Sequence, residues 1–319
     1  HRDLHSFPTR RSSDLAVCRQ LGIPHHVVDL RAEFQQQVID LFVDEYMAGR
    51  TPNPCVACNA TVKWGVLLDA CRQVGADLMA TGHYCRVGFD ETRGRYLLRK
   101  AAHQAKDQSY ALWRLSQEQL ARTRFPLAEL SKERVRQAAA ESGLIVANKG
   151  ESQDVCFILD DDYQRFIIDE IKRRGGAITS GEFVDQADAV VGRHRGYPFY
   201  TIGQRKGLGL SLGRPVFVTE IDAKLNRIHI GDKEDLLAQG LVAEQSNWIA
   251  FAEPPVGAMV EARIRYKDPG YPAVIQDARG DQVEVRFQEP RPAVTPGQSV
   301  VFYQADVLVG GGMITRPIK

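Results

Sequence analysis

The spacing of apolar residues changes near Gly176, and this change limits the folds that the chain can adopt. Before it, stretches with helical periodicity at residues 33–47 and 59–74 alternate with short strand-like runs at 26–30 and 77–81. Such alternation is typical of an α/β domain in which helices cover a parallel sheet. The first part of the chain is therefore predicted to hold such a sheet, with ligands at the carboxyl ends of its strands.

After Gly176 the apolar runs are short and strand-like, and turns such as Thr295-Pro296-Gly297 separate them. From Leu241 onward their spacing predicts a small closed β-barrel. We expect a first α/β domain over residues 16–160, a central α+β domain over 161–236 and the barrel over 237–319. Residues 1–15 have no helical, strand or signal-peptide pattern, and we interpret them as a non-native or mis-joined segment.

The composition limits the class of protein. With a net charge of +1, any nucleic-acid contact must come from local basic patches. No apolar run approaches the roughly 18 residues that a membrane span needs. Six cysteines are too few for a disulfide scaffold, and no secretory signal is recognisable. We expect a monomeric cytoplasmic protein without membrane contact.

Three cysteines are the strongest candidates for chemistry. Cys55 and Cys58 follow a loop stiffened by Pro52 and Pro54, and Cys156 lies 98 positions beyond Cys58. We expect the loop to deliver Cys58 to the first turn of a helix, where the helix N-terminus lowers the pKa of a thiol. The C-x-x-C spacing alone also fits a redox pair, half a zinc site or two ordinary buried thiols. The remaining cysteines look structural: Cys18, Cys71 and Cys85.

Two polar segments and one histidine are candidates for ligand contact. The glycine-rich segment 200–209 contains Arg205 and Lys206, which suits phosphate binding, although a charged surface loop explains it too. Residues 106–110 mix charge, amide and aromatic groups, as a ligand site or a solvated turn would. His83 follows a predicted strand and is either a ligand contact or a structural histidine.

Taken together and in order, these segments resemble those of one family, the tRNA-specific 2-thiouridylases. The resemblance covers nearly the whole chain from Ala16 onward, and its joint specificity is high although no single run is decisive. The matching runs are AGRTPNPCVACN (48–59), ATGHY (80–84), KDQSY (106–110), SQDVCF (152–157), YTIGQRKGLG (200–209), RIRY (263–266), VTPGQSVVFY (294–303) and VGGG (309–312).

The resemblance implies a Rossmann-like ATP-pyrophosphatase domain, a small central domain and a C-terminal β-barrel. In this family ATP, with Mg²⁺, adenylates the C2 oxygen of the wobble uridine of tRNA. A persulfide on Cys156 then supplies sulfur, received from a sulfur carrier or a cysteine desulfurase. Cys58 acts as nucleophile or releases the sulfur by forming a transient disulfide with Cys156.

The same resemblance assigns binding roles to further residues. Gly82 maps to the nucleotide site, and Arg205 and Lys206 form the basic patch that we expect to meet tRNA. The residues that map to tRNA or its target base are Asn53, Pro54, Cys55, His83, Lys106, Asp107, Gln108, Arg265, Tyr266 and Gln298.

Two departures from the family leave alternatives open. The family's Ser-Gly-Gly-x-Asp-Ser phosphate loop is missing from this sequence. We therefore expect a truncated parallel sheet and a chain that is inactive as an enzyme. The alternative function is that of a tRNA-binding protein without catalysis. The family often has Asp where this chain has Cys55. Cys55, Cys58 and Cys156 are therefore alternative ligands of a [4Fe–4S] cluster. A structural zinc module is a third alternative.

Overall fold

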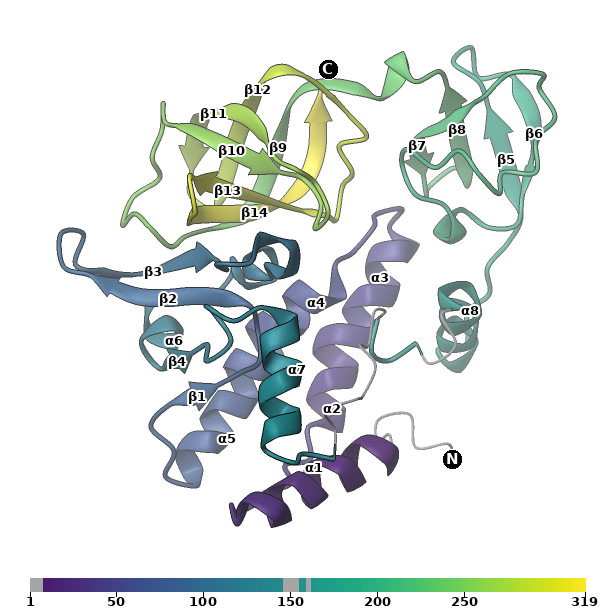
Figure 1. Cartoon of the computed structure of the whole chain (residues 1–319). Helices are drawn as coiled ribbons and strands as arrows, with labels where there is room; N and C mark the ends of the chain where they lie inside the picture. The colour runs from purple at the N-terminus through teal and green to yellow at the C-terminus, as the bar shows by residue number, and fades with distance from the viewer. Residues whose placement is uncertain (1–7, 146–154, 159–161) are drawn as a thin grey trace.

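The computed structural model of the protein describes residues 8–145, 155–158 and 162–319 (Figure 1). A mainly helical region comes first, followed by a small sheet and then by a barrel. The barrel lies beside both other regions and next to the turn between α3 and α4, whose bounds follow below (Figure 1). Residues 152–154 of the predicted Cys156 segment lie outside the described residues.

Two long helices form the centre of the first region. The first consists of α2 (Arg31–Phe34), the π-helical η1 (Gln35–Asp40) and α3 (Leu41–Met47). The second consists of α4 (Pro54–Ala57), the π-helical η2 (Cys58–Leu67) and α5 (Leu68–Gln73). The helix predicted at 33–47 is confirmed. The helix predicted at 59–74 begins earlier, because Oδ1 of Asn53 accepts a hydrogen bond from the amide of Val56 and caps it.

Only a small parallel sheet occurs in the described part of this region. β1 (Met79–Ala80) pairs with β4 (Thr123–Arg124), and β1 confirms the strand predicted at 77–81. The strand predicted at 26–30 is wrong: residues 23–30 form neither helix nor strand, and Val27 is 60% exposed. A strand needs a neighbour for its backbone groups, and no described strand pairs with this segment.

The first region contains further helices, and in Figure 1 α1 lies at the end of the region that is farthest from the barrel. Helix α1 spans Pro8–Leu21, so the expectation that the segment before residue 16 has no helix is wrong for residues 8–15. Helix α7 (Lys132–Glu141) is capped as predicted, since the hydroxyl of Ser131 accepts from the amide of Arg134. The others are α6 (Gln117–Ala121) and the short 3₁₀ helices η3 (Gln104–Lys106) and η4 (Ser109–Leu112).

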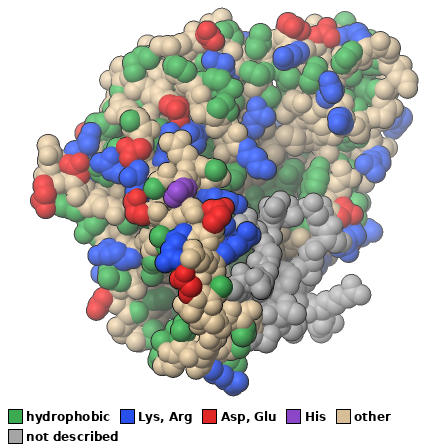
Figure 2. Space-filling view, in the orientation of Figure 1, with side chains coloured by type: hydrophobic (Ala, Val, Ile, Leu, Met, Phe, Trp, Pro, Cys, Tyr) green, Lys and Arg blue, Asp and Glu red, His purple; other side chains and the backbone are tan. Residues whose placement is uncertain are grey.

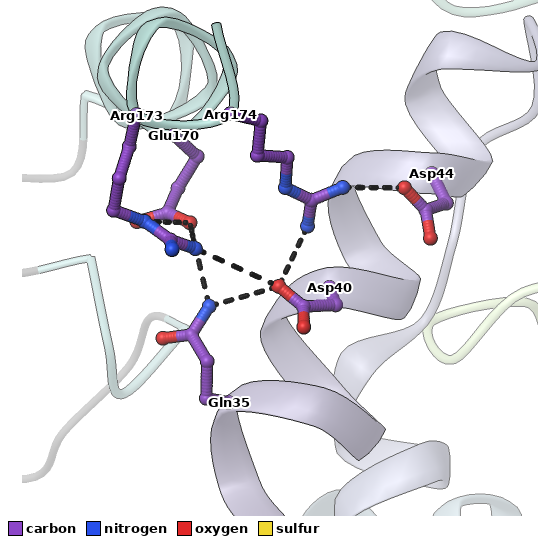
Figure 3. Close-up of polar contacts among 6 residues, drawn as sticks. All are labelled: Gln35, Asp40, Asp44, Glu170, Arg173 and Arg174. Carbon is purple, nitrogen blue, oxygen red and sulfur yellow. Dashed lines mark hydrogen bonds and ion pairs between the residues drawn. The ribbon is translucent and has the colours of Figure 1, made fainter. Parts of the chain in front are cut away.

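The central region is a four-stranded sheet in the order β6-β5-β8-β7. Its elements are β5 (Gly181–Val184), β6 (Val190–His194), η5 (Tyr197–Phe199), β7 (Phe217–Asp222) and β8 (Arg227–Gly231). Helix α8 (Tyr163–Arg173) precedes the sheet and is held against the first long helix (Figure 3). Arg174 bonds to Asp40 at 2.7 Å and to Asp44 at 2.5 Å. Gln35 bonds to Asp40 and to Glu170 of α8.

The C-terminal region is the predicted closed barrel. Six strands pair in the order β13-β10-β11-β12-β9-β14, and the pairing of β13 with β14 closes the ring. The 3₁₀ helix η6 (Glu234–Leu236) leads into it. The strands are β9 (Leu237–Trp248), β10 (Met259–Arg263), β11 (Tyr271–Arg279), β12 (Gln282–Pro292), β13 (Ser299–Gln304) and β14 (Val307–Ile318).

The barrel and the helical region share one core. The hairpin of β2 (Cys85–Asp90) and β3 (Arg95–Lys100) joins the barrel sheet through β14, where Val307 pairs with Arg99. One buried apolar cluster contains Trp64 and Trp113 of the helical region together with Tyr303 of the barrel. A shared core of large buried side chains predicts that these two regions keep a fixed arrangement.

Candidate active site

The loop between α3 and α4 presents two of the three candidate cysteines. Because the helix begins at Pro54, Cys55 lies in its first turn and Cys58 one turn deeper, at the start of η2. The prediction that Cys58 sits in the first turn is therefore wrong. Burial raises the pKa of the Cys58 thiol to about 11, which also contradicts the expected lowering by the helix N-terminus.

Three neighbouring ionisable groups shift the pKa of the Cys58 thiol. Lys63 lowers its pKa, whereas Cys156 and Cys55 raise it, and all three effects are smaller than that of burial. Cys58 itself packs against an apolar cluster that contains Val62 and Phe157. Although Cys55 reaches solvent, the protein atoms around its thiol raise its pKa, and Cys156 adds to this effect.

Cys156 comes from a distant segment and is brought to the same place. Its neighbour Phe157 is buried, and its ring makes edge-to-face contacts with Phe42 at 5.4 Å and with Phe34 at 5.8 Å. This anchor holds the exposed Cys156 within electrostatic range of Cys55 and Cys58. The thiols are not joined, since all six cysteines of the chain are free.

A lysine that the sequence analysis did not single out lies at the centre of the site. Nζ of Lys63 donates to Oδ1 of Asn59 at 2.9 Å, and Nδ2 of the buried Asn59 donates to the carbonyl of Ala111 at 3.0 Å. Because π-helical hydrogen bonds join residues i and i+5, Lys63 lies one turn after Cys58. Among the described residues, Lys63 forms no ion pair with a carboxylate.

His83 and Gly82 lie at the carboxyl end of β1. The ring of His83 packs against Trp64 with centroids 5.4 Å apart, and its Nδ1 is 2.9 Å from the hydroxyl of Thr81. Burial, and secondarily Lys63, lowers the pKa of His83 to about 4, so the ring is neutral at pH 7. Gly82 is exposed at this corner.

Several residues predicted to contact tRNA also hold the protein together. Oδ1 of Asp107 accepts from the amides of Ala101 and Ser109, and Oε1 of Gln108 accepts from the amide of Tyr84. The hydroxyl of Tyr266 donates to the carbonyl of Asp107. Asn53 caps α4, and Pro54 is its first residue. These structural bonds explain why such residue types are needed here even without a ligand.

The predicted cationic contacts are exposed. Lys106, Arg205, Lys206 and Arg265 all reach solvent. Arg205 lines an open cleft of about 280 Å³ together with residues 207–210 and 214–216. On the face shown in Figure 2, Lys and Arg side chains are scattered among acidic ones.

The described residues contain no group of three His, Cys, Asp or Glu side chains placed to hold a metal ion. Cys55, Cys58 and Cys156 lie within the described residues and do not form such a group. Within the same described ranges, no helix combines the length and the apolar character that crossing a bilayer requires.

Three family models match consecutive parts of the chain. They describe a tRNA methyl transferase HUP domain over residues 9–160, a tRNA methyl transferase PRC-barrel domain over 165–232 and an aminomethyltransferase β-barrel domain over 238–314. A tRNA-specific 2-thiouridylase MnmA of Moorella thermoacetica is 47% identical over 298 residues, which are 93% of this chain and 83% of the relative. The chain belongs to the tRNA-specific 2-thiouridylase family.

Other members of this family show the same degree of similarity. The 2-thiouridylase of Chlorobaculum tepidum is 46% identical over 97% of this chain and 84% of its own length. That of Clostridioides difficile is 44% identical over 95% of this chain and 83% of its own length. The HUP match agrees with the Rossmann-like class expected for the first region, and the resemblance seen in the sequence is confirmed.

Proposed function

We propose that this protein is a sulfurtransferase that replaces the C2 oxygen of the wobble uridine of tRNA with sulfur, in the cytoplasm. The observation that carries the proposal is the meeting of Cys58 and Cys156 from distant segments beside Lys63. Two thiols that act on one another electrostatically suit a reaction in which one sulfur is transferred and the other two form a disulfide. The relatives' printed name supports the same substrate and the same atom.

The chemistry can be written so that the electrons balance. The outer sulfur of a persulfide on Cys156 attacks C2 of the activated uridine, and the C2 oxygen leaves with its activating group. The thiolate of Cys58 then attacks Sγ of Cys156. The sulfur–sulfur bond breaks, its electron pair stays with the sulfur on C2, and a Cys58–Cys156 disulfide forms. An external thiol reductant regenerates the two thiols, and a sulfur carrier or cysteine desulfurase renews the persulfide.

The protonation state of Cys58 controls the second step. With a pKa of about 11, the free thiol is protonated at neutral pH and does not attack prematurely. Lys63 is the group that favours its thiolate. When ATP is bound it supplies the activation that makes the C2 oxygen a leaving group, and the exposed Gly82 corner would lie against it. Neutral His83 contributes a ring and a hydrogen bond to the target rather than charge.

The test is thiolation of unmodified tRNA with ATP, Mg²⁺ and a persulfide donor, read as 2-thiouridine by mass spectrometry of the digested tRNA. Cys156→Ser should abolish thiolation while tRNA binding is retained, and Cys58→Ser should stop it after sulfur has reached Cys156. Cys71→Ser, in α5, is the matched control.

Thiouridine formed by the Cys156→Ser protein would refute the persulfide role. Binding of tRNA without thiolation by the parent protein, under conditions in which a family member is active, would instead favour the non-catalytic tRNA-binding alternative.

A further inference from the structure

The barrel is bonded directly to the loop that carries the two neighbouring cysteines. Nε2 of Gln298 donates to the carbonyl of Thr51 at 2.9 Å and to the carbonyl of Pro52 at 3.3 Å. The amide of Thr51 donates back to the carbonyl of Pro296 at 2.9 Å. The amide nitrogen of Gln298 therefore has two acceptors in the loop, and the loop returns one bond to the barrel.

Gly297 shows that this contact depends on close approach of two backbones. The residue is buried with φ +89°, a conformation that favours glycine. A Cβ there would lie 2.9 Å from both the N and the O of Thr51, and 3.0 Å from Cβ of Arg50. Any side chain at this position would push the loop away from the barrel.

The central region holds the same loop from another side. The hydroxyl of Tyr197 donates to the carbonyl of Met47 at 2.7 Å, and the hydroxyls of Thr51 and Thr201 are 3.3 Å apart. Thr201 is the second residue of the glycine-rich segment 200–209, which carries Arg205 and Lys206. The loop is thus bonded both to the barrel and to the segment expected to meet tRNA phosphates.

We propose that Gln298 is a positioning residue for the thiol chemistry: by tying the carbonyls of Thr51 and Pro52 to the barrel, it sets the direction in which Cys55 and Cys58 face. Asn53, the cap of α4, follows Pro52 immediately, so a change in the loop turns the first helical residues with it. The reaction that this positioning serves rests on the proposed function, but the positioning itself is a property of the tRNA-free protein. It differs from the direct tRNA contact that the family resemblance implies for Gln298.

The test replaces Gln298 by Met, which keeps the length of the side chain and removes its donors. In the tRNA-free protein, amide hydrogen exchange at residues 51, 53 and 55–58 should become about tenfold faster, which corresponds to roughly 1.4 kcal/mol. The relative rates at which iodoacetamide alkylates Cys55 and Cys58 should change with it. In thiolation assays kcat should fall while KM for tRNA stays within about twofold of the parent.

Gln304→Met is the matched control, because Nε2 of Gln304 also donates to a backbone carbonyl, that of Met259, but entirely within the barrel. It should leave exchange and alkylation at the cysteine loop unchanged. If Gln298→Met gives parental exchange and alkylation, the positioning role is refuted. If only the affinity for tRNA falls, Gln298 is a direct tRNA contact instead.

A milder variant covers the case in which Gln298→Met does not fold, as judged by near-UV circular dichroism. Gln298→Asn keeps the amide group but shortens the side chain by one methylene, which weakens the bonds to the carbonyls of Thr51 and Pro52. Amide exchange at residues 51–58 should then be faster than in the parent but slower than in a Gln298→Met protein, and exchange at the parental rate overturns the proposal. If the loop responds as expected but the parent makes no thiouridine, the positioning stands and the proposed function fails.

Discussion

Replacing Lys63 by Met should make Cys58 less reactive. The ammonium group of Lys63 lowers the pKa of the Cys58 thiol and is held in place by Asn59. Methionine keeps a chain of similar length but carries no charge. The pKa of Cys58, already about 11, should therefore rise further, and the thiolate should be rarer at every pH below it.

The size of the effect follows from the position of Lys63. With a pKa of about 11, roughly one Cys58 in a thousand is a thiolate at pH 8. An opposite charge within about 4–6 Å shifts a pKa by about 1–3 units. Because Lys63 is partly exposed, solvent screens it, and we expect the lower end of that range. The rate of alkylation at pH 8 should fall about tenfold.

The assay measures alkylation of the tRNA-free protein by iodoacetamide between pH 7 and 10, with tandem mass spectrometry to separate Cys58 from Cys55. Lys63→Arg keeps the charge and should stay near the parental rate. His83 is a second reporter: since Lys63 also lowers its pKa, Lys63→Met should raise the histidine pKa from about 4, as followed by NMR.

Two outcomes would contradict this reasoning. The first is a Lys63→Met rate at pH 8 within twofold of the parent. The second is an equal fall in Lys63→Arg, which would show that shape rather than charge matters. High salt should slow the parental protein more than Lys63→Met, because ions screen only the interaction that the variant has lost.

Three further predictions concern stability. Trp64→Phe removes the buried 2.7 Å hydrogen bond from the indole to the hydroxyl of Thr123 and should lower the free energy of unfolding by about 1–3 kcal/mol in urea titrations. Gly297→Ala should cost at least about 1 kcal/mol, because its Cβ would meet the backbone of Thr51 at a strained φ. His83 binds a proton less readily in the folded state than in the unfolded state. Its contribution to the free energy of unfolding is therefore fully present above pH 6.5 and is lost as the pH falls toward about 4. His83→Gln should remove this dependence of stability on pH.

Matched variants separate these effects from nonspecific ones. Trp248→Phe changes a tryptophan that stacks on Phe302, and it should not show the hydrogen-bond penalty. Gly280→Ala adds a Cβ at φ +61° with no atom within 4 Å, so it should reveal the cost of φ without the clash. If Trp64→Phe and Trp248→Phe, or Gly297→Ala and Gly280→Ala, lower the free energy of unfolding equally, the energetic roles of the Trp64–Thr123 and Gly297–Thr51 contacts are refuted.

Much of the fold was predictable because it depends on local patterns. The helix over residues 33–47, the cap at Ser131 and the strand at 77–81 follow from periodicity and capping, and the structure has them. The strand at 26–30 was wrong because apolar alternation gives a strand only where a neighbour supplies hydrogen bonds, and no described strand does so here.

The cysteine residues were predictable from sequence, but their electrostatic environment was not. Cys58, the proline-containing loop before it and Cys156 can all be read from the sequence. The family resemblance assigned both cysteines to one reaction. The sequence analysis placed Cys58 one turn too early, because the capping bond of Asn53 was not recognised. The sequence analysis also missed Lys63. Lys63 follows Cys58 by five residues, and this spacing indicates one helical turn only if the helix is known to be π-helical.

The sequence by itself determined the class of each region and the family, since both depend on the order of residues along the chain. Only the tertiary structure decided that burial holds the thiol of Cys58 in its protonated form. Only the structure showed that Asp107 and Gln298 are bonded within the protein. The physical reason is that solvation, charge and hydrogen-bond partners depend on neighbours in space, and these neighbours come from segments that no local pattern connects.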